Sequence, residues 1–136
     1  MEIAQILFRG KEKTGILNHS WLKGSLDNTD SDFPRIIFKD RFGNRIYADV
    51  DKSTIGQYIG RDDINKRNIF EGDIVEYILS GRKNKNIGYI KYYKENCSFV
   101  IIPNDIDFCY PDHDYIDDVE YMKVIGNIFD NTNLIV

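Results

Sequence analysis

The chain has 136 residues and a formal net charge of −4, from 18 basic and 22 acidic side chains. This length allows one compact domain with its own hydrophobic core, or two small lobes, and excludes two full-sized domains. The net negative charge argues against a protein that coats DNA or a membrane through its overall field, and leaves a local basic patch open.

The apolar residues are of the types that favour strands. The chain contains 21 Ile, 9 Tyr and 8 Phe, and β-branched and aromatic side chains pack well on a pleated surface. No stretch reaches the roughly 18 apolar residues of a membrane span, and the N-terminus lacks the pattern of a secretory signal. We therefore expect a mainly β, cytoplasmic protein that does not bind membranes, with Cys97 and Cys109 reduced.

The first part of the chain predicts short strands joined by turns. Residues 3–8 fit either a strand or a short helix, and residues 21–26 fit a strand. After a polar loop, residues 35–39 and 45–49 are expected to form a hairpin, because the DRFGN turn between them contains the flexible Gly43-Asn44 pair. Residues 1–53 should thus form a lobe of β-hairpins.

The central part predicts further strands. Residues 54–59 alternate as in a short strand, and residues 61–68 read as a charged turn. Residues 73–79 and 87–93 then form two strands of a meander, with an exposed tip at residues 81–86.

The last part continues this meander. Residues 98–103 form its third strand, and an acidic loop over residues 104–118 follows. A final strand over residues 119–129 returns to the sheet, with a bend or bulge at Gly126. Closely spaced strands joined by hairpin turns favour a strongly bent sheet, so residues 54–136 are expected to form a small bent barrel.

Four stretches of the chain resemble one known family. Near the N-terminus these are the FRGK sequence of residues 8–11, and Trp21 followed by Gly24. The strongest match is TIGQYIG at residues 54–60, followed by an acidic turn and IFEGDIV at residues 69–75. A further match is VIGNIFDN at residues 124–131. Together they resemble the YopX-like proteins of bacteriophages and prophages.

This resemblance implies an SH3-like barrel in the C-terminal part, a phage or prophage origin, and no catalytic residues, because none are established for the family. The turn of the family usually reads Asp-x-Asn-Gly. Here Lys66 stands at the Gly position, which argues against a type I′ turn. The residues expected to shape the backbone of the matching stretches are Gly56, Gly60, Gly72, Asp73, Gly126 and Asn127.

Two acidic groups suggest chemistry, and each has a simpler explanation. Glu71 and Asp73 could divide acid and base roles or bind a cation, but Gly72 between them favours a turn at a strand entry. A second group could ligate Ca²⁺, Mn²⁺ or Mg²⁺. Its members are Asp105, Asp107, Asp112, His113, Asp114, Asp117, Asp118 and Glu120. Their spacing does not match an EF-hand loop, so a solvated acidic loop is favoured and no metal or cofactor is expected.

Basic residues near three tyrosines suggest a nucleic-acid interface. Cationic groups could contact phosphates while Tyr89, Tyr92 or Tyr93 stacks on bases. The candidate contact residues are Lys66, Arg67, Arg82, Lys83 and Lys85. A solvated hairpin is the alternative interpretation, because alternation along the strand places at least some of these rings in the core.

The charge is unevenly distributed along the chain. Residues 104–120 carry seven acidic side chains and no Lys or Arg, so the rest of the chain has a net charge of +3. This acidic loop could meet the basic tip of another subunit, or fold back on its own barrel, and subunit pairing would also cover sheet edges. Our leading hypothesis is a non-enzymatic, homo-oligomeric interaction protein. The alternatives are a nucleic-acid-binding module using residues 81–93 and a metal-dependent enzyme using residues 105–118.

Overall fold

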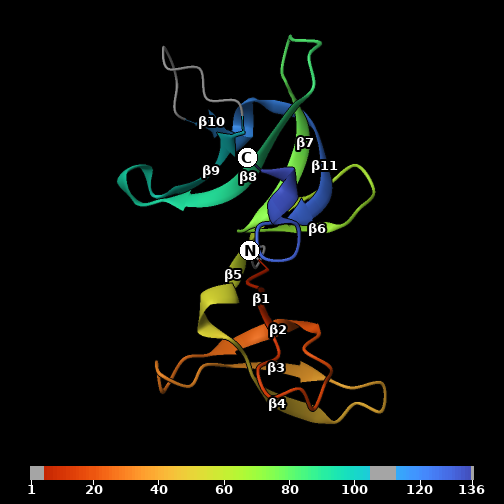
Figure 1. The fold of residues 1–136 in the computed structure, drawn as a ribbon, viewed down its shortest axis with the longest axis vertical. Helices are drawn as coiled ribbons and strands as arrows, with labels where there is room; N and C mark the ends of the chain where they lie inside the picture. The colour runs from red at the N-terminus through yellow and green to blue at the C-terminus, as the bar shows by residue number, and fades with distance from the viewer. Residues whose placement is uncertain (1–4, 105–112, 136) are drawn as a thin grey trace, which may run out of the picture. The chain divides into compact units, whose positions relative to one another are not determined.

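The computed structural model describes residues 5–104 and 113–135, which form two antiparallel sheets and no α-helix. The strand orders are β4-β3-β2-β1-β5-β6 and β10-β9-β8-β7-β11 (Figure 1). The expectation of a mainly β protein is therefore confirmed. The chain divides into two compact units, Met1–Gly60 and Arg61–Val136, here called unit 1 and unit 2. The sequence placed the division at residues 53 and 54, a few residues earlier.

Unit 1 is built from hairpins. Its elements are β1 (Phe8–Lys11), β2 (Trp21–Asp27), β3 (Arg35–Lys39), β4 (Arg45–Asp49), the 3-10 turn η1 (Lys52–Thr54) and the beginning of β5 (Gly56–Asp62). The β3–β4 hairpin has the expected bounds. β1 lies at the end of the ambiguous stretch at residues 3–8 and beyond it. β5 begins two residues later than expected and continues into the predicted charged turn.

Alternation along β4 separates the core of unit 1 from its surface. Ala48 and the following Val50 are buried beside Ile36, whereas Arg45 and Tyr47 are exposed. Gly10 lies against Val50 so closely that an added Cβ would stand 3.0 Å from the Val50 Cβ. This approach lets the chain after β1 reach β4, where Glu12 forms an isolated bridge with Val50.

Unit 2 contains the remaining strands. They are β6 (Asn68–Phe70), β7 (Asp73–Leu79), β8 (Asn86–Tyr93), β9 (Ser98–Pro103), β10 (Asp114–Tyr115) and β11 (Val119–Asn127). Three 3-10 turns accompany them, η2 (Lys94–Asn96), η3 (Ile116–Asp118) and η4 (Thr132–Leu134). The meander β7-β8-β9 matches the prediction. The predicted acidic loop instead holds β10 and η3 at its end, and its residues 105–112 lie outside the described chain.

The sheet of unit 2 is open rather than a closed barrel. Its strand order ends at β10 and β11, and among the described residues these two strands do not pair. The β7–β11 register shifts between Val119 and Tyr121 and again between Val124 and Gly126, so the bulge expected at Gly126 is present. The expected barrel closure is thus wrong, because β10 is only two residues long and pairs with β9 alone.

Tyr77 links the core of unit 2 to the short strand β10. Its side chain is fully buried, and its hydroxyl donates a 2.6 Å hydrogen bond to Asp114 Oδ2. Burial raises the pKa of Tyr77 far above its usual value, and the bond to Asp114 raises it further. Tyr77 therefore stays protonated and links β7 to β10.

Candidate functional site

In the Glu71-Gly72-Asp73 group, both carboxylates accept hydrogen bonds from backbone amides. Gly72 has φ +91°, a left-handed conformation that favours glycine. Asp73 is buried, and its Oδ2 accepts a 2.8 Å bond from the Phe70 amide. Glu71 Oε2 accepts from the Tyr92 amide at 3.2 Å. The two carboxylates thus hold different backbone segments, an arrangement that supports a turn at a strand entry rather than a catalytic pair.

The other glycine and asparagine motif residues also shape the backbone. Asn127 Oδ1 accepts from the Phe129 and Asp130 amides at 3.0 and 2.9 Å. A Cβ at Gly126 would lie 2.6 Å from Asn131 Oδ1, so a larger residue there would displace the Asn131 side chain, which accepts from the Asn127 amide in the turn after β11. In β5, the buried Gly56 pairs with Arg9, and Gly60 has φ +88°.

Asp63 organises the turn between β5 and β6, a role that the sequence analysis did not assign to it. Its Oδ1 accepts from the Asn65 and Arg67 amides, and its Oδ2 accepts from the Val124 amide, each at 2.9 Å. Burial would raise its pKa, but these three bonds and the Arg67 charge lower the pKa below its usual value. Lys66 takes the left-handed conformation, with φ +63°, at the position where the family turn has Gly.

This turn covers the edge of β11. The Ile64 amide donates to the Met122 carbonyl at 2.9 Å, next to the Asp63–Val124 bond. Arg61 extends the cover, because its guanidinium donates to the carbonyls of Ile116 and Val119 at 3.0 and 2.9 Å. At Val119, Met122 and Val124, the outer edge of β11 is therefore bonded by residues of its own unit.

The basic candidate residues lie in two separate turns of unit 2. Lys66 and Arg67 belong to the turn before β6, whereas Arg82 and Lys83 are exposed at the β7–β8 tip (Figure 1). Lys85 is engaged on the sheet, since its Nζ lies 3.4 Å from Glu76 Oε1 and 5.8 Å from the centre of the Tyr121 ring. The structure therefore does not gather the five cations into one phosphate-binding patch.

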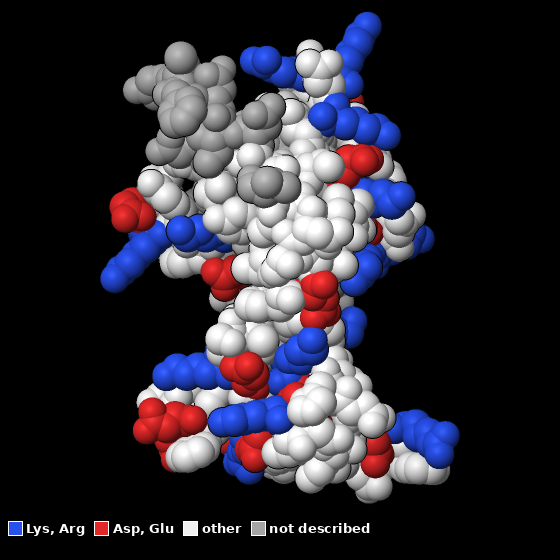
Figure 2. All heavy atoms as spheres, in the orientation of Figure 1, with Lys and Arg blue, Asp and Glu red and all other residues white. Residues whose placement is uncertain are grey.

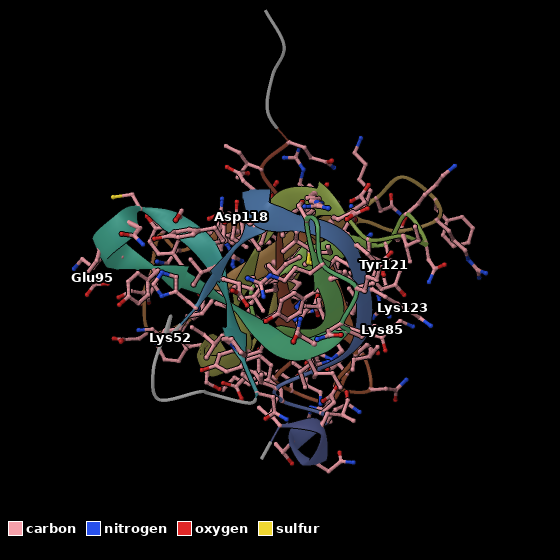
Figure 3. All side chains as sticks on the ribbon, turned by 90° about the horizontal axis from the view of Figure 1, so that it is seen from above. Lys52, Lys85, Glu95, Asp118, Tyr121 and Lys123 are labelled. Atoms are coloured by element: carbon pink, nitrogen blue, oxygen red, sulfur yellow. The ribbon has the colours of Figure 1, made fainter. Side chains whose placement is uncertain are left out.

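Figures 2 and 3 agree with the separation of the basic side chains. Lys85, Tyr121 and Lys123 lie together at one side of unit 2, and Glu95 lies at the opposite side (Figure 3). On the face drawn in Figure 2, acidic side chains are interspersed among the basic ones. Of the tyrosines proposed to stack on bases, Tyr92 is exposed and packs edge-on against Phe99, while Tyr89 and Tyr93 are half-buried.

The acidic candidate residues are only partly described. Asp105, Asp107 and Asp112 lie outside the described residues, and Asp114 accepts the Tyr77 bond. No cluster of three or more His, Cys, Asp or Glu side chains that could hold a metal occurs within residues 5–104 and 113–135. The His113 ring is tilted against the Tyr93 ring and lies edge-on to the Tyr115 ring, with centroid distances of 4.6 and 5.1 Å.

In unit 1, Glu12 organises the loop between β1 and β2. Its buried carboxylate accepts hydrogen bonds from Thr14 and from the Gly15 and Leu17 amides. Burial would raise the pKa of Glu12, but these bonds and one from the His19 amide lower it from 4.5 to about 2. His19 turns back on the same residue, with Nδ1 3.1 Å from the Glu12 carbonyl oxygen.

The outer edge of β4 is open. The Asp40 amide donates to the Asn44 carbonyl and the Val50 amide to the Pro34 carbonyl, so even-numbered residues of this strand face β3. The odd-numbered residues face away. Lys13 covers one of them, because its amide donates to the Asp49 carbonyl at 2.9 Å. Within the described chain, no backbone hydrogen bond is made by the outward groups of the other two, Arg45 and Tyr47.

Charged and aromatic side chains lie on the outer face beside this edge. Lys39 and Arg45 stand directly opposite each other in the β3–β4 pair, and both are exposed. Further along the same face, the Arg35 guanidinium lies 4.9 Å from the centre of the Tyr47 ring and forms a 2.6 Å ion pair with Asp27. The positive charge of Arg35 is thus balanced, unlike those of Lys39 and Arg45.

A hollow lies where β4 ends. Its volume is about 330 Å³, at the lower end of the range for ligand pockets. Phe33 at its rim is exposed, and the Lys13 Nζ lies 5.9 Å from the centre of the Phe33 ring. The lining residues are Lys13, Thr14, Phe33, Pro34, Asp49 and Val50.

The profile of the YopX protein family matches residues 7–136, nearly the whole chain. The chain belongs to the YopX family. A solved structure, protein EF1440 from Enterococcus faecalis, has a TM-score of 0.52 and 22% identity, and the match covers 98% of this chain and 100% of that chain. At this identity the likeness shows the fold alone. Comparison with curated proteins gives no match.

These contacts explain the structural role of two of the stretches that resemble the family. The acidic turn covers β11, and the C-terminal stretch builds the turn that follows this strand. None of the helical turns in the described residues is long and apolar enough to cross a membrane. β4 lies outside the stretches of the chain that resemble the family.

Proposed function

We propose that this YopX-family chain is a non-enzymatic interaction protein, encoded by a phage or prophage, that acts in the bacterial cytoplasm by assembling with copies of itself or with another protein. The observation that carries the proposal is the open edge of β4. An unpaired edge is a template for another strand, and proteins generally cover such edges or block them with charge or distortion. Unit 2 covers its β11 edge in this way.

The hydrogen bonds of the buried carboxylates support the proposal that the protein is not an enzyme. Glu12, Asp63 and Asp73 are buried, and each accepts hydrogen bonds from backbone amides. Such bonds stabilise the ionised carboxylate, as the lowered pKa values of Glu12 and Asp63 show. A general acid or base instead needs a pKa near the working pH and a reachable proton.

Self-assembly is the first form of this function to test. Light scattering of the purified chain across micromolar concentrations should give a mass above that of the 15.9 kDa monomer. A strictly monomeric mass over this range would refute self-assembly, and would leave assembly with another protein to the binding experiment below.

A nucleic-acid-binding module remains the second candidate, because Arg82 and Lys83 are exposed at the β7–β8 tip. Binding through phosphate contacts should weaken steeply as the salt concentration rises. A gel-shift assay with single- and double-stranded DNA and RNA at low salt tests this candidate. If no complex forms there, this function is removed.

A further inference from the structure

The open edge of β4 also indicates which kind of partner it fits. This inference rests on the proposed function and specifies the class of partner. We propose that the edge of β4 binds an extended, acidic segment of another protein, which adds to the sheet of unit 1 as a further strand. Strand addition of this kind obtains affinity from main-chain hydrogen bonds and specificity from the alternating side chains.

The backbone defines where the segment binds. The N–H and C=O groups of Arg45 and Tyr47 point away from β3, and their outward side is free within the described residues. Lys13 occupies the next outward position, because its amide is bonded to the Asp49 carbonyl. The segment therefore pairs with β4 only as far as Tyr47 and then has to leave the edge.

The charges define the chemistry of the segment. Like charges directly opposite each other in a sheet are destabilising, and Lys39 and Arg45 are such a pair. Neither forms an ion pair with a described residue. The nearby Asp40 carboxylate already accepts from the Phe42 and Asn44 amides at 2.9 Å, within its own turn. A carboxylate carried by the partner, placed beside Arg45, would balance this excess of positive charge.

The same charges argue against a second copy of β4 as the occupant. Pairing of two β4 edges would bring a further Lys39 and Arg45 to a site that already has excess positive charge. A pairing that set Arg45 against Asp49 of the other copy would be electrostatically favourable, but Lys13 already occupies the outward side of Asp49. An acidic partner avoids both problems.

The hollow next to β4 provides a second contact. A segment that leaves the edge at Lys13 is next to the hollow, because Lys13 is one of its lining residues. Phe33, Pro34 and Val50 are its apolar lining residues, and its volume is about 330 Å³. These walls fit an apolar side chain. Residues two apart in a strand share a face, so the expected pattern is an acidic residue beside Arg45, an apolar residue two positions away beside Tyr47, and a further apolar anchor.

The experiment selects a displayed library of random linear peptides against the immobilised full-length chain. Enriched peptides should contain an acidic residue two positions from an apolar one. A fluorescent copy of the most enriched peptide is then titrated by anisotropy against the wild type and its variants. Tyr47→Pro removes an outward backbone amide together with the tyrosine ring. It should weaken binding about tenfold relative to Tyr47→Ala, the equivalent of roughly one hydrogen bond.

Matched controls separate the backbone, the charge and the cavity. Tyr47→Ala keeps the amide and should weaken binding less than Tyr47→Pro does. Added salt should weaken binding to the wild type, and the double variant Lys39→Glu with Arg45→Glu should abolish binding. Lys52→Glu, an exposed charge reversal elsewhere in unit 1, should change binding less than twofold. Phe33→Ala should weaken binding several-fold, because Phe33 lines the hollow.

Several results would overturn the proposal. These are the absence of any enriched peptide, enrichment without acidic residues, and wild-type affinity in a folded Tyr47→Pro variant. If that variant does not fold, N-methylation of the peptide backbone tests the same bonds, and full affinity of every singly methylated peptide contradicts strand addition. A loss of self-association in Tyr47→Pro without peptide binding would make a second copy the occupant and refute the acidic partner.

Discussion

The two units of this chain differ in whether the backbone groups at a sheet edge are hydrogen-bonded by their own chain. In unit 2, Arg61, Asp63 and Ile64 bond the backbone groups of Val119, Val124 and Met122 at the edge of β11. In unit 1 the edge of β4 is open at Arg45 and Tyr47. An edge that is covered by its own chain contributes to folding, whereas an open edge is available for contact. The contacts on the β11 edge therefore contribute to the stability of unit 2, whereas the β4 edge is the surface through which we propose that unit 1 binds a partner.

Removal of the edge cover should have the largest effect. Asp63→Ala leaves the buried Val124 amide and the partly buried Asn65 and Arg67 amides without their acceptor, and an unsatisfied buried amide costs about 1–3 kcal/mol. We expect the free energy of unfolding to fall by about 3 kcal/mol and the uncovered β11 edge to promote aggregation. Urea unfolding followed by circular dichroism measures the loss. The exposed neighbour Asp62 is the control, and an equal loss in Asp62→Ala would contradict the role assigned to Asp63.

The entry to β7 should be nearly as sensitive. Gly72→Val places a β-branched residue at φ +91° and should lower the free energy of unfolding by about 1–3 kcal/mol. Gly60→Ala is a useful comparison, because Gly60 has φ +88° and an added Cβ meets nothing within 4 Å. The decrease in the free energy of unfolding of Gly60→Ala therefore measures backbone strain alone. A neutral Gly72→Val variant would show that unit 2 does not depend on this turn.

In unit 1, the Glu12 loop should give stability a distinct pH dependence. Hydrogen bonds lower the pKa of Glu12 from 4.5 to about 2, so its contribution is complete above pH 4.5 and is lost as the pH falls towards 2. The stability difference between the wild type and Glu12→Gln should therefore shrink over this interval. Thermal unfolding at a series of pH values measures it. A constant difference down to pH 2 would contradict the prediction.

The contribution of the unit 2 tip to assembly should be smaller. If charge holds the assembly together, the combined Arg82→Glu, Lys83→Glu and Lys85→Glu variant should shift the mass towards monomer in light scattering, and added salt should do the same. We expect only a partial shift, because Lys85 is already engaged with Glu76. Oligomers that persist through both changes would show that the contact is apolar or backbone-mediated.

The smallest expected change is a gain in stability. Lys66 has φ +63° in the turn organised by Asp63, and a non-glycine residue in this conformation is strained by about 1–2 kcal/mol. Lys66→Gly should therefore raise the free energy of unfolding by up to about 1 kcal/mol, after the entropy cost of glycine is subtracted. Urea unfolding provides the measurement, and a loss of stability would show that the Lys66 side chain contributes to the turn.

The sequence predicted the longer strands well and the short ones poorly. β3, β4 and β7 had the expected bounds, because alternation and turn residues mark strands of five to seven residues. β6 and β10 are three and two residues long, too short for a pattern to show. The open sheet of unit 2 was also missed, since closure depends on pairing between distant strands.

The features proposed to matter for function were the least visible in the sequence. Asp63 bonds Val124 across 61 residues, and no local pattern reports such a contact. Arg45 and Tyr47 were assigned to the correct strand. The open position of that strand follows from the order β4-β3-β2-β1, which a single sequence does not give. The acidic and basic runs are visible in the sequence because they are local, although the basic residues lie in two separate turns of the structure.

Amide hydrogen exchange measured by NMR on the free chain tests the contrast between the two edges most directly. The Arg45 and Tyr47 amides should exchange rapidly, the Ile46 and Ala48 amides that face β3 should be protected, and the Val124 amide held by Asp63 should be protected as well. Protection of Tyr47 equal to that of Ala48 in the monomeric chain would show that the β4 edge is covered, and would contradict the account.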